Sequence, residues 1–282
     1  MFTKNTCNFP QSLIRYAFLI DNNNLMANFI KKQLKRTKII AGMGNTLIGG
    51  FAAAKRIGAF KEPPRDVLPK YIQTFCRKMT HAFGVEVVQV KPVPQTHGLW
   101  VSNHISWLDI PVVGSVAPVF FLSKAEIGEW FIFGRLARAG GTLFIKRGSG
   151  DADGVARQIA DFLRGGSSVV FFPEATTTDG KLIKTIHGKL LQASMDTGLP
   201  ICPVVIAYVN ADGTLSDDCA YYDKRTMAES LRRVADSDGV KAYVLPLTPL
   251  SPKDKTRTEL TEMLQQTMEE GLAELHRQAI KA

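Results

Sequence analysis

Residues 103–109 read Asn-His-Ile-Ser-Trp-Leu-Asp and directly follow the run 98–102, Gly-Leu-Trp-Val-Ser, which is typical of a short buried strand. They place an imidazole, His104, five residues ahead of a carboxylate, Asp109. Side chains share a helix face at spacings of three or four residues, so these two meet only where the chain turns between them. The stretch therefore predicts a strand-to-helix corner, with Asp109 as the N-cap of a helix that has Pro111 in its first turn and ends before Pro118.

An imidazole held by a carboxylate is a candidate general base. It can accept a proton from a hydroxyl group while the carboxylate fixes the tautomer and stabilises the imidazolium that forms. By this hypothesis His104 is the base and Asp109 orients it. A histidine near a strand end is often only a hydrogen-bonded structural residue, so the pair alone leaves both roles open.

The composition is that of a globular protein with an anionic partner. The chain has 282 residues, 45% of them hydrophobic and 22% charged, which suits one large α/β domain or a domain with a helical appendage. A formal net charge of +9 favours contact with nucleic acid, a phospholipid surface or acidic proteins. No zinc-finger, RRM-like or helix-turn-helix signature accompanies this charge, so we expect no nucleic-acid partner.

The cysteines and histidines form no pattern typical of a metal site or a disulfide scaffold. The four cysteines have no paired spacing, and neither CxxC nor HExxH occurs. This usage fits a reducing cytoplasm. Because the apolar run 13–20 is short and lacks a small-residue cleavage site, we expect no signal peptide and no export.

The first 60 residues differ from the rest of the chain. Run 39–60 is apolar and glycine-rich but interrupted by polar residues, and it follows the basic cluster Lys31, Lys32, Lys35, Arg36 and Lys38. No segment reaches the roughly 18–20 apolar residues that span a bilayer. A helix lying on anionic lipid and a solvated basic helix packed on the domain are both open interpretations. Pro63, Pro64 and Pro69 then divide the chain into a helical appendage, 1–65, and a main domain, 66–282.

Short β-rich runs alternate with helical ones along the main domain. Strands are expected at 86–90, 99–102, 119–122, 142–146, 168–172, 201–209 and 242–245, and helices at 71–83, 126–138, 154–163, 185–196, 227–235 and 255–280. Alternation of this kind predicts an α/β fold with a largely parallel, mixed sheet covered by helices. In such sheets sites collect at the carboxyl ends of the strands, and there the sequence places His104, Lys124, Arg147 and Glu174.

Three more blocks follow the His–Asp block in order. Run 140–147 is Gly-Gly-Thr-Leu-Phe-Ile-Lys-Arg and ends on Arg147, run 169–178 is Val-Val-Phe-Phe-Pro-Glu-Ala-Thr-Thr-Thr, and run 199–206 is Leu-Pro-Ile-Cys-Pro-Val-Val-Ile. None is diagnostic singly, because a lone Arg or Lys at such a position is usually a surface charge. Together, over about residues 95–210, the four blocks resemble the glycerolipid acyltransferase superfamily, which contains the bacterial 1-acyl-sn-glycerol-3-phosphate acyltransferases.

The resemblance implies an O-acyltransferase. It would move a fatty acyl group from the thioester of acyl carrier protein or coenzyme A to the free hydroxyl of a lysolipid, without an acyl-enzyme, a bound cofactor or a metal. His104 and Asp109 match the catalytic block, and Arg147 matches the strand that contacts phosphate. The remaining expected substrate-binding residues are Asn103, Ser106, Lys124, Phe172, Pro173, Glu174 and Thr176. The implied location is peripheral, on the cytoplasmic face of the bacterial inner membrane, with the basic N-terminal segment docked on anionic lipid.

The third block departs from the family's Phe-Pro-Glu-Gly-Thr-Arg pattern at two positions, Ala175 and Thr177. The missing arginine matters because a phosphate is normally met by more than one cationic or backbone donor. Lysophosphatidate, giving phosphatidic acid, is the acceptor expected from family frequency, whereas Thr177 resembles relatives that acylate lyso-ornithine lipid. A non-catalytic lipid-binding protein on the same fold and a thioester hydrolase are further hypotheses. Acyl-chain length, the donor and the oligomeric state are left open.

Overall fold

The computed structural model describes residues 11–146 and 150–280, with side chains from residue 26 onward. Within these residues seven strands form one sheet in the order β1-β7-β6-β2-β5-β3-β4. The strands are β1 (Val85–Gln89), β2 (Leu99–Ser102), β3 (Val119–Lys124), β4 (Leu143–Ile145), β5 (Ser168–Phe171), β6 (Ile201–Asn210) and β7 (Val240–Pro246). All neighbouring pairs are parallel except β6 with β7, so the predicted mixed, largely parallel sheet is confirmed.

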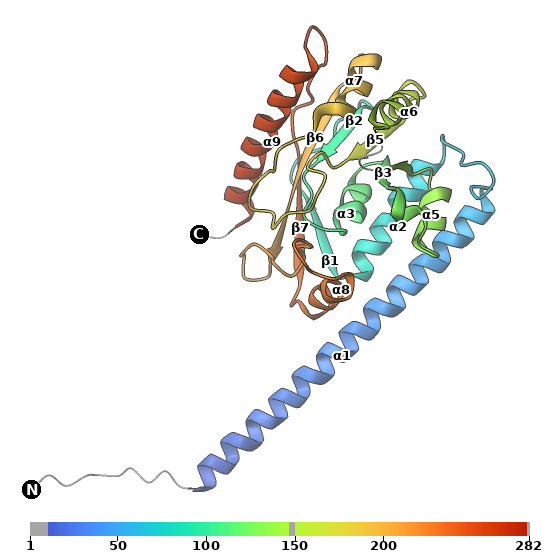
Figure 1. Cartoon of the computed structure of the whole chain (residues 1–282). Coiled ribbons are helices and arrows are strands. Elements are labelled where there is room, and N and C mark those ends of the chain that lie inside the picture. The colour runs from blue at the N-terminus through green and yellow to red at the C-terminus, as the bar shows by residue number, and fades with distance from the viewer. Residues whose placement is uncertain (1–10, 147–149, 281–282) are drawn as a thin grey trace, which may run out of the picture.

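Helices cover both faces of the sheet (Figure 1). Strand residues alternate between the two apolar cores, with Leu99 and Val101 in one and Trp100 in the other. The helices are α1 (Gln11–Arg56), α2 (Leu68–Ala82), α3 (Asp109–Val116), α4 (Ala125–Gly128), α5 (Phe133–Ala139), α6 (Ala152–Arg164), the 3₁₀ turn η1 (Gly188–Leu191), α7 (Gln192–Thr197), α8 (Met227–Asp236) and α9 (Arg257–Ala279). The core of the Leu99 face also contains side chains of α6, α7 and α9, and that of the Trp100 face contains side chains of α2, α3 and α8.

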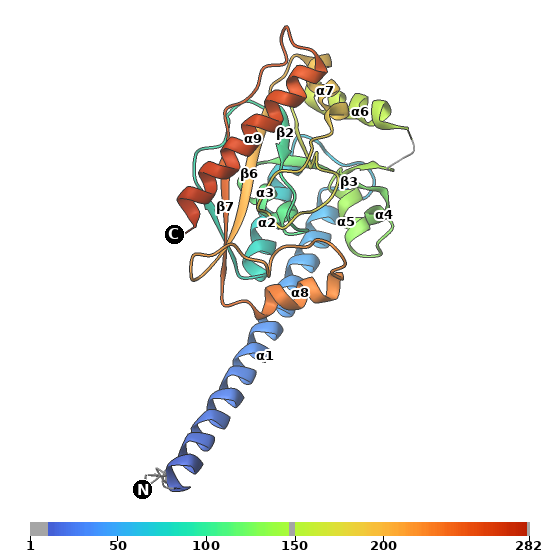
Figure 2. The same ribbon diagram turned by 60° about the vertical axis from the view of Figure 1, so that its left-hand side comes forward.

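Helix α1 is a single long rod whose N-terminal half stands clear of the domain, as Figures 1 and 2 both show. Its other half is docked, because Ile39 and Ala54 are buried in the two cores. Arg36 adds a two-pronged contact with Asp236 of α8, in which both nitrogen-to-oxygen distances are 2.7 Å. Across the described ranges 11–146 and 150–280, no helix is both long and apolar enough to cross a membrane.

Two predicted helices are wrong in extent. The helix expected at 126–138 is split into α4 and α5, because Gly134 packs so closely on Gly128 that a Cβ atom there would lie 2.2 Å from the Gly128 carbonyl oxygen. The intervening residues 129–132 form an exposed turn. The helix expected at 185–196 starts only at Gly188, because the preceding main-chain N–H groups donate to distant acceptors: that of Ile186 to Gln265 and that of His187 to Pro173.

Candidate active site

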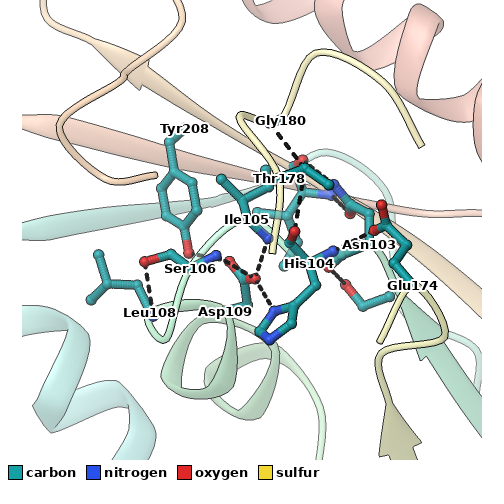
Figure 3. Close-up of polar contacts among 12 residues, drawn as sticks. Asn103, His104, Ile105, Ser106, Leu108, Asp109, Glu174, Thr178, Gly180 and Tyr208 are labelled. Carbon is teal, nitrogen blue, oxygen red and sulfur yellow. Dashed lines mark hydrogen bonds and ion pairs between the residues drawn. The ribbon is translucent and has the colours of Figure 1, made fainter. Parts of the chain in front are cut away.

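His104 lies just beyond the carboxyl end of β2, the central strand of the sheet, and faces Asp109. Figure 3 shows the chain turning between them. The Nδ1 atom of His104 lies 2.7 Å from Oδ2 of Asp109. The same oxygen accepts the main-chain N–H groups of Ile105 at 2.7 Å and Ser106 at 2.9 Å. The sequence thus brings its two predicted catalytic residues together through a tight turn.

The role of Asp109 in the helix differs from the prediction. Leu108 occupies the N-cap position, and Asp109 is the first residue of α3. Its carboxylate points back into the turn, where it accepts N–H groups that precede the helix, so it is not the N-cap. The side chain of Asp109 is fully buried, whereas that of His104 keeps 19% of its surface exposed. With Nδ1–H donating to the carboxylate, Nε2 is the ring nitrogen that can accept a proton.

Glu174 joins the end of β5 to the turn that contains His104. Its Oε1 accepts the main-chain N–H of His104 at 2.7 Å, and its Oε2 accepts the main-chain N–H of Lys184 at 2.8 Å. Burial raises the pKa of this carboxyl group, while the two N–H donors counteract the rise. Both carboxylate oxygens are therefore used to hold backbone.

Two other residues of the same segment fix the histidine. The main-chain N–H of Thr178 donates to the carbonyl oxygen of His104 at 2.8 Å, so both backbone polar groups of His104 are held by this segment. The ring of Phe172 stacks on the imidazole, with 4.2 Å between centroids and 16° between planes. Between them Ala175 adopts a φ of +57°, a left-handed conformation that glycine takes without strain. Ala175 thus adopts the left-handed conformation that suits the glycine of the family pattern at this position.

Several predicted substrate-binding residues have their polar atoms in internal hydrogen bonds. The side-chain amide of Asn103 donates to the carbonyl oxygen of Ile206 at 3.1 Å and accepts its N–H at 2.8 Å, which extends the pairing of β2 with β6. Ser106 is fully buried, and its Oγ accepts the N–H of Leu108 at 3.3 Å. The carbonyl oxygen of the buried Pro173 accepts the N–H of His187. These hydrogen bonds lie within the protein, and binding of substrate by the three residues stays a prediction.

The remaining predicted residues are exposed or lie outside the described part. Lys124 is the last residue of β3 and Thr176 lies two residues after Glu174, and both are exposed. Arg147, the expected phosphate contact, falls outside the described residues. In the described part of the chain, no three His, Cys, Asp or Glu side chains gather as metal ligands.

Sequence reasoning missed one residue of this site. Tyr208 of β6 donates its hydroxyl hydrogen to Oδ1 of Asp109 at 2.8 Å. It sits in an apolar strand, 99 residues from its partner, and belongs to none of the four blocks. A tyrosine within an apolar strand was the available signal in the sequence. It could have indicated a buried hydrogen bond, since the hydroxyl group of a buried tyrosine usually finds a partner.

An apolar groove of about 280 Å³ lies beside the site, between α1, α2, α5 and β3. Its lining includes Ala53 of α1, Phe75 of α2, Phe121 of β3, Leu136 of α5 and Ile110, the residue that follows Asp109. Exposed apolar side chains continue outward from it at Trp130, Phe131, Ile132 and Phe133. The groove and this apolar rim suit a hydrocarbon chain better than a polar ligand.

Comparison with known proteins agrees with this architecture. A family model described as Acyltransferase matches residues 84–207. A lyso-ornithine lipid O-acyltransferase of Pseudomonas aeruginosa is 34% identical over 209 residues, covering 73% of this chain and 81% of that protein. A 1-acyl-sn-glycerol-3-phosphate acyltransferase of Neisseria gonorrhoeae is 33% identical over 141 residues, which are 50% of this chain and 55% of that protein.

A solved structure shares the fold. The crystal structure of the 1-acyl-sn-glycerophosphate acyltransferase of Thermotoga maritima superposes with a TM-score of 0.64, covering 88% of this chain and 97% of that one at 19% identity. At this identity the likeness concerns the fold alone.

The mixed sheet, the hydrogen-bonded His–Asp pair at its carboxyl edge and these matches define an α/β enzyme of acyl transfer. The chain belongs to the acyltransferase family. The family and fold class predicted from the four sequence blocks and from the strand alternation are confirmed.

Proposed function

We propose that this acyltransferase moves a fatty acyl group from an acyl thioester to the free hydroxyl of a lysolipid, with His104 as general base and Asp109 as its orienting partner. The observation that carries the proposal is the 2.7 Å contact between Nδ1 of His104 and the fully buried Asp109 carboxylate. It leaves Nε2 of a partly exposed imidazole to receive a proton from an alcohol.

The reaction follows from that geometry. The acceptor oxygen attacks the thioester carbonyl carbon while its proton passes to Nε2 of His104. The tetrahedral intermediate then collapses, the carbon–sulfur bond breaks, and the proton on His104 goes to the departing thiolate. Asp109 stabilises the imidazolium between these two steps. No acyl-enzyme is needed, and the thioester of acyl carrier protein or of coenzyme A supplies the same chemistry.

Lyso-ornithine lipid is the acceptor that the observations favour. Thr177 stands where the family pattern has an arginine, and the Pseudomonas relative that this chain covers over 81% of its length is named a lyso-ornithine lipid O-acyltransferase. An acceptor without phosphate does not need the missing cation. Lysophosphatidate is the second candidate, favoured by the Neisseria relative and by the position expected for Arg147.

The apolar groove is proposed to hold a fatty acyl chain. Its lining is mainly aliphatic and aromatic, with a few polar residues such as Lys78 and Ser123, and it includes Ile110, which follows Asp109 in the chain. Replacing Leu136 by Trp should shorten the groove, so the preferred acyl thioester should shift to shorter chains. An unchanged chain-length profile would contradict this placement.

We propose that the side of the protein with α1 and the turn between α4 and α5 docks on an anionic membrane surface. In bacteria this would be the cytoplasmic face of the inner membrane. Phe131 is 81% exposed and Ile48 of α1 is 72% exposed, and the exposed cations Lys31, Lys32, Lys38, Lys55 and Arg56 lie along the same helix. Apolar side chains and cations together bind anionic lipid surfaces. Phe131→Ser with Ile132→Ser should reduce flotation with anionic vesicles, whereas Met263→Ser, a matched change on α9, should not.

Acyl transfer from a labelled thioester tests the function as a whole. Wild type, His104→Ala and the surface control His81→Ala are assayed with lyso-ornithine lipid, lysophosphatidate and no acceptor, and with each of the two thioesters. We expect wild type and His81→Ala to acylate a lysolipid. The rate of acyl transfer by His104→Ala should be at least about 100-fold lower than that of wild type. Full activity of His104→Ala would overturn the catalytic assignment, and fatty acid release without any acceptor would indicate a hydrolase.

A further inference from the structure

Asp109 is held by hydrogen bonds on both of its carboxylate oxygens. Oδ2 receives Nδ1–H of His104 and the two main-chain N–H groups of the turn. Among the described residues the structure records one donor to Oδ1, the hydroxyl group of Tyr208 at 2.8 Å. Figure 3 shows the tyrosine approaching Asp109 from the opposite side to His104.

Tyr208 reaches Asp109 because β6 is longer than its neighbour. Strand β6 pairs in parallel with β2 up to the partners Ser102 and Val204, and then continues to Asn210 beneath the catalytic turn. The phenol ring is packed in the same core as α3, and only 2% of the residue is exposed. A buried hydroxyl without a partner is costly, so the contact with Asp109 is what makes tyrosine acceptable at this position.

The hydroxyl group is always available as a donor. Burial, together with the nearby Asp109 charge, raises the pKa of Tyr208 well above its ordinary value. The phenol therefore keeps its proton over the whole range in which the enzyme can work. Rotation of the carboxylate about its Cβ–Cγ bond would break hydrogen bonds at both oxygens, so the bond at Oδ1 helps to keep Oδ2 directed at His104.

We propose that Tyr208 is a positioning residue of the catalytic pair: its hydroxyl group fixes the carboxylate plane of Asp109 and takes up part of the carboxylate's negative charge. The proposal rests on the roles proposed above for His104 and Asp109. Without the hydroxyl group, Asp109 would be less well oriented and would hold the imidazolium form of His104 more strongly.

Tyr208→Phe removes the hydroxyl group and keeps the ring. We expect kcat to fall about tenfold, the loss typical of one hydrogen bond to a charged group, with KM for both substrates unchanged. Because the less neutralised carboxylate favours the protonated imidazole, the acidic limb of the kcat/KM profile should move to higher pH. Tyr243→Phe, on the neighbouring strand β7, is the matched control and should leave both quantities unchanged.

A second variant keeps the test valid if Tyr208→Phe does not fold. Incorporation of 3-fluorotyrosine at position 208 keeps the hydroxyl group but makes it a stronger donor, so the acidic limb should move to lower pH. A merely structural tyrosine would change stability and leave the limb in place. Wild-type kcat and an unmoved limb in folded Tyr208→Phe would overturn the proposal, as would an unmoved limb in the fluorotyrosine enzyme.

The double variant Asp109→Asn/Tyr208→Phe separates this proposal from the proposed function. If Tyr208 acts through Asp109, the second substitution should add little to the loss caused by the first. A fully additive loss would overturn the proposal while leaving the His–Asp mechanism intact. Activity of His104→Ala, in contrast, would remove the mechanism itself.

Discussion

The main-chain N–H of His104 donates a 2.7 Å hydrogen bond to the Glu174 carboxylate, which ties the ends of the neighbouring strands β2 and β5 together. The second oxygen of Glu174 holds the N–H of Lys184, so one buried side chain joins three segments of the site. A carboxylate used in this way sets the position of the imidazole. We infer from these contacts that Glu174 affects catalysis through His104, while its expected contact with substrate stays a prediction.

Glu174→Gln should lower kcat about tenfold with little change in KM. Glutamine has one acceptor oxygen, so one of the two N–H groups would face an amide NH₂, and a lost hydrogen bond to a charged group costs about 1.5–3 kcal/mol. The measurement is steady-state kinetics, with Glu262→Gln on the exposed side of α9 as the control. Equal reductions in both variants would contradict the positioning role.

The raised pKa of Glu174 predicts that its contribution to the free energy of unfolding depends on pH. Burial raises the folded-state pKa of Glu174 above the ordinary value of 4.5. The folded chain therefore holds this proton more tightly than the unfolded chain, and the stabilisation is complete below 4.5 and lost as pH rises through the raised pKa. The free energy of unfolding of wild type minus that of Glu174→Gln should thus be largest at acid pH and decline toward neutrality. Urea denaturation at several pH values measures it, and a difference that grows with pH would be the contrary result.

Ala175→Gly should stabilise the protein. The φ of +57° destabilises a residue with a Cβ atom by about 1–2 kcal/mol, and glycine removes this strain. Glycine also increases the entropy of the unfolded chain, which cancels part of the gain in stability. We expect a net gain of about 1 kcal/mol and unchanged kcat, measured by thermal and urea denaturation. The matched control Ala273→Gly, at an exposed position inside α9, should instead lose about 1 kcal/mol. Destabilisation by both changes would show that the turn at residue 175 is not strained.

The ion pair of Arg36 with Asp236 should hold the docked half of α1 on α8. The hydrogen bond from Arg36 lowers the pKa of Asp236 below its ordinary value of 3.8. The ion pair therefore stabilises the folded chain fully above pH 3.8, and this stabilisation is lost as the pH falls through the lowered pKa. At neutral pH, Asp236→Asn should speed hydrogen–deuterium exchange of peptides covering residues 32–43 severalfold. Asp238→Asn, an exposed neighbour, should not. Equal exchange in all three proteins would mean that this ion pair does not hold the helix, which other contacts, such as that of Lys35 with the Ser237 carbonyl oxygen, would then dock.

The strands were predictable from the sequence, because short-range patterns of apolar and turn residues determine them. The seven strands were expected within a few residues, because strand alternation and turn residues are local signals. The break in the helix expected at 126–138 was not predictable, because it depends on the close approach of Gly128 and Gly134 after the chain has folded. The contact of Tyr208 with Asp109 likewise depends on the length of β6 relative to β2. Long-range contacts of this kind leave no trace in residue spacing.

Thr177→Arg should shift acceptor preference toward lysophosphatidate. Thr177 is partly exposed in the segment that starts at Glu174, and arginine there would restore the cation of the family pattern. A new charge-assisted hydrogen bond to a phosphate oxygen contributes about 1.5–3 kcal/mol, so kcat/KM for lysophosphatidate relative to lyso-ornithine lipid should rise at least about tenfold. Thr177→Gln, which adds length without charge, is the control and should leave the ratio near that of wild type. The ratio is measured with both lysolipids in one reaction, so differences in enzyme concentration cancel. If both variants change the ratio equally, the residue at this position acts through size, and the absence of arginine carries no information about the natural acceptor.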